Sequence, residues 1–244
     1  ARIYGYDRIP STLMADELPP QRRNDMLEAE ERARQVLAGA GLQEIISYSL
    51  TSLQAEARIE PAGAVLNPAD YVRLANPLSG EREFMRRALL PSMLDTVAAN
   101  LRHVEQILLF EIGSVYLPVA GEPLPAEPRH LTLAMTGPRD VHHWSGAAGD
   151  ALDFFDLKGV VETLLARLQV RDAAFEPYGE IPYAPGRSAT LRLGDEVAGH
   201  LGELHPVVRQ RFDLPAQAVC VAELNFETIM AHADRSLLVQ PISR

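Results

Sequence analysis

The chain has 244 residues, of which 47% are hydrophobic and 23% charged, and its formal net charge is −10. This length can bury the core of one large domain or two small ones. The negative charge makes the chain a poor stand-alone nucleic-acid binder, because non-specific binding depends on Lys and Arg neutralising phosphates, and any RNA contact should be local or depend on a partner. A single cysteine, Cys220, excludes an intrachain disulfide and a cysteine-based zinc cluster, and is typical of a reducing cytoplasm. No apolar run approaches the ~20 residues that span a bilayer.

The first predicted element is a helix over residues 25–40, which follows a proline-containing connector at 8–20. Asp25 and Glu28 have the spacing of a capping box, and Gly41 is a natural stop. The apolar stripe of this helix is rich in small side chains, which suits close packing against another helix. Its members are Met26, Ala29, Ala33, Val36, Leu37 and Ala40. The pattern leaves open whether the stripe is buried within the chain or contacts another subunit.

Strands and two further helices follow. Pro91 begins one helix, which runs to about residue 101, and residues 157–168 form the other, with a helical turn or two at 206–212. The almost continuously apolar residues 107–116 are typical of a central strand buried on both faces. We expect strands over 44–50, 72–76, 107–116, 131–136, 189–193, 197–201 and 219–224. Hairpin-like strand pairs with few intervening helices predict a largely antiparallel sheet with helices packed on it, an α+β fold.

The residues carry no pattern of known catalytic chemistry. The sequence has no P-loop, no Gly-x-Gly-x-x-Gly and no Gly-x-Ser-x-Gly elbow. The adjacent His142 and His143 point apart in any regular element, and His200 and His205 lie across a turn. Cys220 lies inside an apolar strand and is expected in the core. We therefore expect no catalytic, cofactor-binding or metal-ligating residue.

Several charged residues have an expected partner or role. Lys158 lies near a helix N-terminus, where its charge opposes the helix dipole, so we expect Asp153 or Asp156 to be its partner. Glu203 and His205 could form an acid/base pair, although a role in stabilising the turn fits better. The tight basic clusters are expected to be ordinary solvated charges: Arg22 with Arg23, Arg86 with Arg87, and Arg209 with Arg211.

Six segments in order over the chain resemble the synthetase-like core of bacterial phenylalanyl-tRNA synthetase β subunits. The segments lie at residues 1–10, 76–94, 109–113, 153–159, 185–189 and 199–206, and include Asn76-Pro-Leu-Ser79 and Leu109-Phe-Glu-Ile-Gly113. Two departures from the family pattern are Ser92, where glycine is common, and Ala184, where a histidine is usual. The resemblance implies a class II aminoacyl-tRNA-synthetase-like fold, with an antiparallel sheet flanked by helices.

The resemblance also implies a domain plan and a set of partners. Residues 1–20 would be the tail of a preceding domain and a linker, 21–240 the catalytic-like core, and 241–244 the start of a connection to a further domain. The core would work in the cytoplasm within an (αβ)₂ heterotetramer whose α subunit carries the active site. ATP, Mg²⁺ and tRNA would belong to the holoenzyme, with no cofactor on this segment. The family's dimerisation helix corresponds to residues 25–40, which implies subunit-interface roles for Met26, Ala29, Ala33, Val36 and Leu37.

The family's class II signatures are eroded in this chain. In an active member, the strand equivalent to 109–116 runs into an arginine and then an acidic residue, whereas here residues 117–120 carry no charge. A later Gly-rich strand should lead to an arginine for the ATP phosphates, and here Glu223 and Glu227 stand instead. Carboxylates would repel a triphosphate, which favours a non-catalytic assembly module. The alternatives are an active adenylate-forming ligase of class II type and a scaffold in an unrelated complex.

Overall fold

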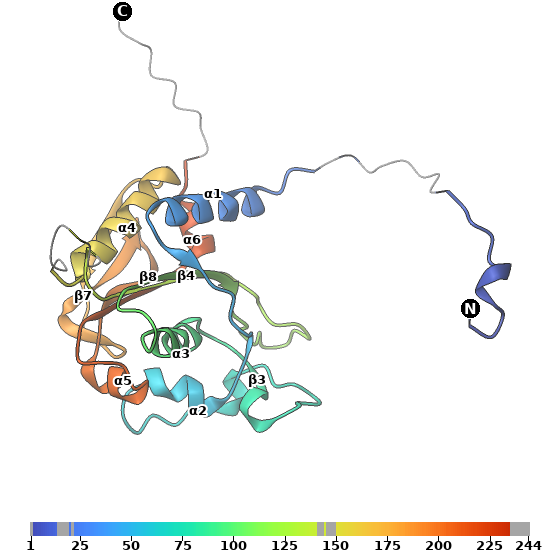
Figure 1. The fold of residues 1–244 in the computed structure, drawn as a ribbon, viewed down its shortest axis with the longest axis horizontal. Coiled ribbons are helices and arrows are strands. Elements are labelled where there is room, and N and C mark those ends of the chain that lie inside the picture. The colour runs from blue at the N-terminus through green and yellow to red at the C-terminus, as the bar shows by residue number, and fades with distance from the viewer. Residues whose placement is uncertain (1, 14–19, 21, 141–143, 145–149, 235–244) are drawn as a thin grey trace, which may run out of the picture.

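The computed structural model describes residues 2–13, 20, 22–140, 144 and 150–234 (Figure 1). Its centre is a seven-stranded sheet with the order β1-β4-β5-β9-β8-β7-β6. Every neighbouring pair is antiparallel except β1 and β4, which are parallel. The strands of this sheet are β1 Gln43–Glu44, β4 Ile107–Ser114, β5 Arg129–Thr136, β6 Ala173–Pro177, β7 Tyr183–Leu193, β8 Glu196–Leu204 and β9 Val219–Asn225. A small second sheet pairs β2 (Leu50–Thr51) with β3 (Phe84–Met85).

Helices cover both faces of the large sheet (Figure 1). One face carries α1 (Asp25–Gly39), α4 (Phe154–Arg167) and α6 (Phe226–Ala231), and the other carries α2 (Leu53–Glu56), α3 (Leu90–Asn100) and α5 (Pro206–Arg211). Short 3-10 turns lie at Tyr6–Arg8, Ala57–Ile59, Pro68–Asp70 and Gly80–Arg82. Each face has its own apolar cluster, so the sheet is buried on both sides. No helix among the described residues has the length and apolar character that crossing a bilayer requires.

The helix boundaries follow from local capping. The Asn24 side chain accepts the backbone N–H groups of Met26 and Leu27, both at 3.2 Å, and so begins α1 in place of the predicted Asp25 capping box. Asp153 and Asp156 form a reciprocal capping box at the start of α4. Such caps satisfy N–H groups that have no partner within the helix.

The predicted strand at 44–50 is wrong over most of its length. Residue 44 ends β1 and residue 50 begins β2, so the segment between them passes from the large sheet to the small one. In this segment the Ser47 hydroxyl donates to the Glu111 carboxylate at 2.6 Å. The segment is thus fixed by a side-chain contact with β4 in place of continuous strand pairing. The predicted strand at 72–76 is likewise reduced to one bridge between Arg73 and Phe84.

The remaining predicted strands and helices are present, although β7 begins at Tyr183 and so extends well before the expected strand at 189–193. The helices α2 and α6 and the strands β3 and β6 lie outside the predicted elements. The predicted connection at 241–244, together with His142 and His143, falls outside the described residues.

Candidate functional site

A line of polar side chains crosses the sheet on the face that packs against α3. Strand register pairs each member with the next across five neighbouring strands. Because side chains alternate along a strand, paired residues share a face. The members of this polar row are Glu111, Thr132, Glu223, His200 and Thr190. The strands that the eroded class II signatures single out, β4 and β9, both contribute to the row, and β5 lies between them.

A buried ion pair stands at the β4 end of the polar row. Arg86 Nη1 lies 2.8 Å from Glu111 Oε1, and the two side chains are only 4% and 2% exposed. The other Glu111 oxygen accepts the Ser47 hydroxyl, and Arg86 Nε donates to the Ser114 carbonyl at 3.0 Å. A Cβ at Gly113 would lie 2.4 Å from the Arg86 guanidinium, so glycine leaves the space this pair occupies. Sequence reasoning missed the pair, although a charged Glu111 inside an apolar strand signals a buried partner.

Glu223 anchors the start of α3. Its two carboxylate oxygens accept the backbone N–H groups of Leu89 and Leu90, at 2.9 and 3.0 Å. The imidazole Nδ1 of His130 lies 3.2 Å from the same carboxylate. A negative charge at a helix N-terminus is favoured by the free N–H groups and by the helix dipole. The carboxylate that sequence reasoning placed in a lost ATP site therefore serves as a helix cap.

We expect the Glu223→Ala substitution to lower the free energy of unfolding by about 2 kcal/mol, because two backbone N–H groups lose their acceptor. Glu223→Gln keeps an acceptor oxygen and should lose about half as much. Urea unfolding at pH 7 measures both values. Glu227→Gln is the matched control, because the one hydrogen bond that Glu227 accepts within the described part of the chain comes from the exposed N–H of Arg129. Equal losses at the two positions would contradict the capping role.

A second carboxyl, Glu56, is buried next to Glu223. It ends α2 and is only 4% exposed. Burial raises the pKa of Glu56 to about 7, and the Glu223 charge adds to this rise. The Thr51 hydroxyl and the Arg87 backbone oppose the rise in pKa in part. Glu223 in the polar row and the adjacent Glu56 thus lie in an environment that disfavours additional negative charge.

A hollow of about 320 Å³ opens over the middle of the polar row. His130, Glu223 and Asn225 line it on one side, and Tyr183 and His200 line it on the other. None of the described residues that line it is a lysine or an arginine. Burial lowers the pKa of His200, so this imidazole adds no positive charge near neutral pH. Across the described residues, no cluster of three or more His, Cys, Asp or Glu side chains is placed to hold a metal ion.

The model of the family described as "Phenylalanyl tRNA synthetase beta chain CLM domain" matches residues 9–226. The chain belongs to this family. This CLM domain is 42% identical over 250 residues to the phenylalanine–tRNA ligase beta subunit of Symbiobacterium thermophilum, and 37% identical over 253 residues to that of Moorella thermoacetica. Each match covers the whole chain but only 27% and 30% of the relative. The chain thus spans less than a third of the curated relatives it matches.

A solved structure with a similar fold is pyrrolysyl-tRNA synthetase from Desulfitobacterium hafniense. The TM-score is 0.66 at 16% identity, over 88% of this chain and 75% of that one. The likeness confirms the expected α+β, class II synthetase-like fold of the CLM domain, with a mostly antiparallel sheet between layers of helices.

The five residues predicted at a subunit interface lie against the core of the CLM domain. Ala29, Ala33 and Leu37 are at most 6% exposed and pack in the cluster beneath α1 and α4. Met26 and Val36 are partly buried against the same cluster. Packing within the chain accounts for the small side chains of this stripe, and its role between subunits stays a prediction.

Lys158 has a different partner from the one predicted. It pairs with Glu162 one turn along α4 and lies 4.5 Å from the centre of the Phe175 ring. Asp156 instead binds Arg139 through two contacts of 2.9 Å, which holds the pKa of Asp156 below its usual range. The expected pairing was wrong because the capping box turns Asp156 back toward the start of the helix.

Glu203 and His205 each have another partner. Glu203 pairs with Arg187 at 2.8 Å, and His205 Nδ1 accepts the Val207 N–H at 3.2 Å. His205 thus caps α5, as its expected turn-stabilising role requires. Cys220 is fully buried as predicted, and burial raises the pKa of its thiol to about 12.

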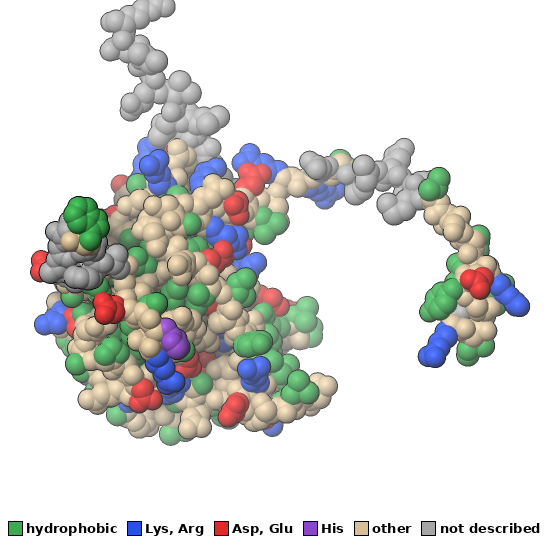
Figure 2. Space-filling view, viewed as in Figure 1, with side chains coloured by type: hydrophobic (Ala, Val, Ile, Leu, Met, Phe, Trp, Pro, Cys, Tyr) green, Lys and Arg blue, Asp and Glu red, His purple; other side chains and the backbone are tan. Residues whose placement is uncertain are grey.

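The basic clusters divide into solvated and structural charges. Arg22 and Arg23 are exposed as expected, and Lys and Arg side chains lie interspersed with Asp and Glu on the face in Figure 2. The same expectation is wrong for Arg86, which is buried with Glu111. It is also wrong for Arg211, whose guanidinium donates to backbone carbonyls of the segment after α2.

Proposed function

We propose that this CLM domain is a non-catalytic assembly module of phenylalanine–tRNA ligase, supporting ATP-dependent attachment of phenylalanine to its tRNA by an α subunit. One observation carries the proposal: the hollow over the polar row is lined by Glu223 and, among the described residues, by no lysine or arginine. A site that transfers an adenylate or phosphoryl group needs cations arranged where negative charge develops.

The charged groups near the hollow already form contacts that stabilise the fold. Arg86 is compensated by Glu111, and both side chains are buried. The N-terminus of α3 would otherwise attract an anion, but Glu223 occupies it. A triphosphate entering this hollow would meet the carboxylate of Glu223 rather than a cationic clamp. The domain is therefore suited to support and not to chemistry.

The supporting role is assembly. In the proposed (αβ)₂ heterotetramer the α subunit binds ATP and Mg²⁺, and tRNA is held by the whole assembly in the cytoplasm. The relatives are named as beta subunits of the ligase, which favours this arrangement. Apolar clusters on both faces of the sheet make the CLM domain a rigid body on which other parts can be oriented.

Phenylalanine-dependent ATP–pyrophosphate exchange tests the proposal. We expect no exchange by this chain alone and exchange when the α subunit and the complete β polypeptide are combined. Isothermal titration of the chain with ATP and Mg²⁺ should show no micromolar binding. Exchange by the chain alone, or micromolar ATP binding, would instead favour an active adenylate-forming ligase.

A further inference from the structure

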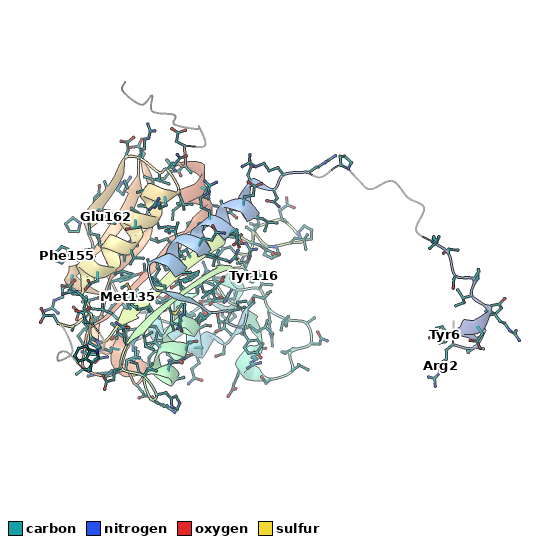
Figure 3. All side chains as sticks on the ribbon, turned by 45° about the horizontal axis from the view of Figure 1, so that its top comes forward. Arg2, Tyr6, Tyr116, Met135, Phe155 and Glu162 are labelled. Atoms are coloured by element: carbon teal, nitrogen blue, oxygen red, sulfur yellow. The ribbon has the colours of Figure 1, made fainter. Side chains whose placement is uncertain are left out.

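A short segment of the chain borders the hollow over the polar row. This rim segment, residues 53–60, consists of α2, the 3-10 turn Ala57–Ile59 and Glu60. Ile59 lines the hollow together with Leu90 at the start of α3. Figures 1 and 3 show α2 on the side of the sheet away from α1 and α4. The position of the rim segment therefore sets one side of the hollow.

Two arginines hold the C-terminal end of the rim segment. The Arg58 guanidinium donates to the Arg211 carbonyl at 3.1 Å and pairs with Asp95 of α3 at 2.8 Å. The same guanidinium lies 3.6 Å from the centre of the Phe212 ring. Arg211 in turn donates to the carbonyls of Arg58 and Glu60, at 3.1 and 2.5 Å. These contacts fix residues 58–60 to α3 and α5.

The N-terminal end of the rim segment is held differently, because α2 buries an acid. Of the four residues of α2, only Glu56 is buried, with 4% of its surface exposed. A helix ordinarily buries apolar side chains, and burial of a carboxylate is costly unless a positive charge pairs with it. The Thr51 hydroxyl and the Arg87 backbone are hydrogen-bonding partners of Glu56. The Arg87 guanidinium lies over the Tyr71 ring, 5.2 Å from its centre.

Charged and titratable groups face Glu56 from the neighbouring elements. Burial raises the pKa of Glu56 to about 7, and the charge of Glu223 on β9 adds to the rise. Arg87, between β3 and α3, opposes the rise. Burial raises the pKa of Tyr71 to about 12, so this side chain stays neutral between pH 6 and 8. His130 of β5 lies 3.2 Å from Glu223. Because Glu223 carries the charge that caps α3, the proton of this carboxyl pair belongs on Glu56.

We propose that Glu56 is a proton-dependent latch for α2. The protonated carboxyl holds α2 against the sheet, and the ionised carboxylate releases α2 toward solvent. Arg58 and Arg211 hold residues 58–60 in place in both states. A helix of four residues is not stable without tertiary contacts, so its release breaks its backbone hydrogen bonds. Since Glu56 lies next to Glu223, which lines the hollow, the release opens the hollow to solvent on that side.

The latch has a defined direction with pH. The closed state favours the protonated form of Glu56, so its stabilisation is complete below the ordinary pKa of 4.5 and is lost as the pH rises through about 7. The hollow is therefore more often open above neutral pH than below it. This behaviour lies within the CLM domain and does not depend on the proposed assembly role.

Amide hydrogen exchange, measured by mass spectrometry on the complete β polypeptide that carries this chain, tests the latch. The amides of residues 55–57 are hydrogen-bonded in the closed state. After correction for intrinsic exchange, they should exchange about 10-fold faster at pH 8 than at pH 6, as linkage gives for a carboxyl with a pKa of about 7 when closed and 4.5 when open. The Glu56→Gln variant has no proton to lose at this position and should show no rise.

Two comparisons make the test specific. Glu60→Gln is the matched control, because Glu60 lies on the same rim segment and is only partly buried, and it should keep the 10-fold rise. The amides of β8 should be better protected than those of residues 55–57 at both pH values. Equal protection would mean that α2 opens only when the whole domain unfolds, which overturns the latch. A rise that is absent from the unaltered protein, or that persists in Glu56→Gln, would also overturn it.

Discussion

Replacing Arg86 with methionine should lower the free energy of unfolding by about 3–5 kcal/mol, because Glu111 would keep a buried charge without its partner. The pair is almost fully buried and lies where β4 meets the segment between the two sheets. Urea unfolding at pH 7, followed by circular dichroism, measures the loss. A loss of under about 1 kcal/mol would mean that solvent reaches Glu111 after the substitution.

Two companion variants assign the effect to the buried charge. Adding Glu111→Leu to Arg86→Met should recover most of the lost stability, since apolar replacement of a whole buried pair is often neutral. Arg73→Met removes the cation of the Arg73–Glu83 pair, in which Arg73 is 66% exposed. That change should cost under about 1 kcal/mol, as for other exposed pairs.

Glu56→Gln should stabilise the domain at pH 8 by about 3 kcal/mol and have little effect near pH 4.5. The folded-state pKa of Glu56 is about 7, whereas its ordinary value is 4.5. Because the fold favours the protonated form, its contribution is fully present below the unfolded pKa and is lost as the pH rises toward 7. Each unit of pKa difference corresponds to about 1.4 kcal/mol, and glutamine never ionises. Unfolding free energies measured from pH 4.5 to 8 should show the difference growing with pH.

The groups around Glu56 supply the control for this pH dependence. Thr51, Tyr71, Arg87 and Glu223 are the interacting neighbours, and Glu223 is the one whose charge raises the pKa of Glu56. Glu223→Gln should therefore shift the pH dependence of Glu56 to lower pH. If the stability difference between the unaltered protein and the Glu56→Gln variant does not change with pH, then Glu56 does not titrate in this range.

Periodicity in the sequence predicted the main helices because α1, α3 and α4 each bury one regular apolar stripe. It failed for the segment at 44–50, where the apolar residues look like a strand but Ser47 is committed to Glu111. It also missed β6, a five-residue edge strand whose exposure alternates over its first four residues. Its first three residues are all apolar, so this alternation is not visible in the sequence. Competition between local propensity and a distant side chain cannot be read from a short window.

The candidate site was predicted only in part. The eroded signatures identified Glu223 as a departure from a nucleotide site, but not as the cap of α3. That role depends on contacts 134 and 133 positions apart in the chain, which register and packing set.

The cap that Glu223 places on α3 ties the charge of this sheet face to the position of a helix. A cation at residue 223 would stand against the positive end of α3 and leave the Leu89 and Leu90 amides without an acceptor. Converting this face to bind phosphates would thus require moving the helix as well as changing side chains. A succession of single substitutions would pass through less stable proteins, so the fold opposes a stepwise conversion to phosphate binding.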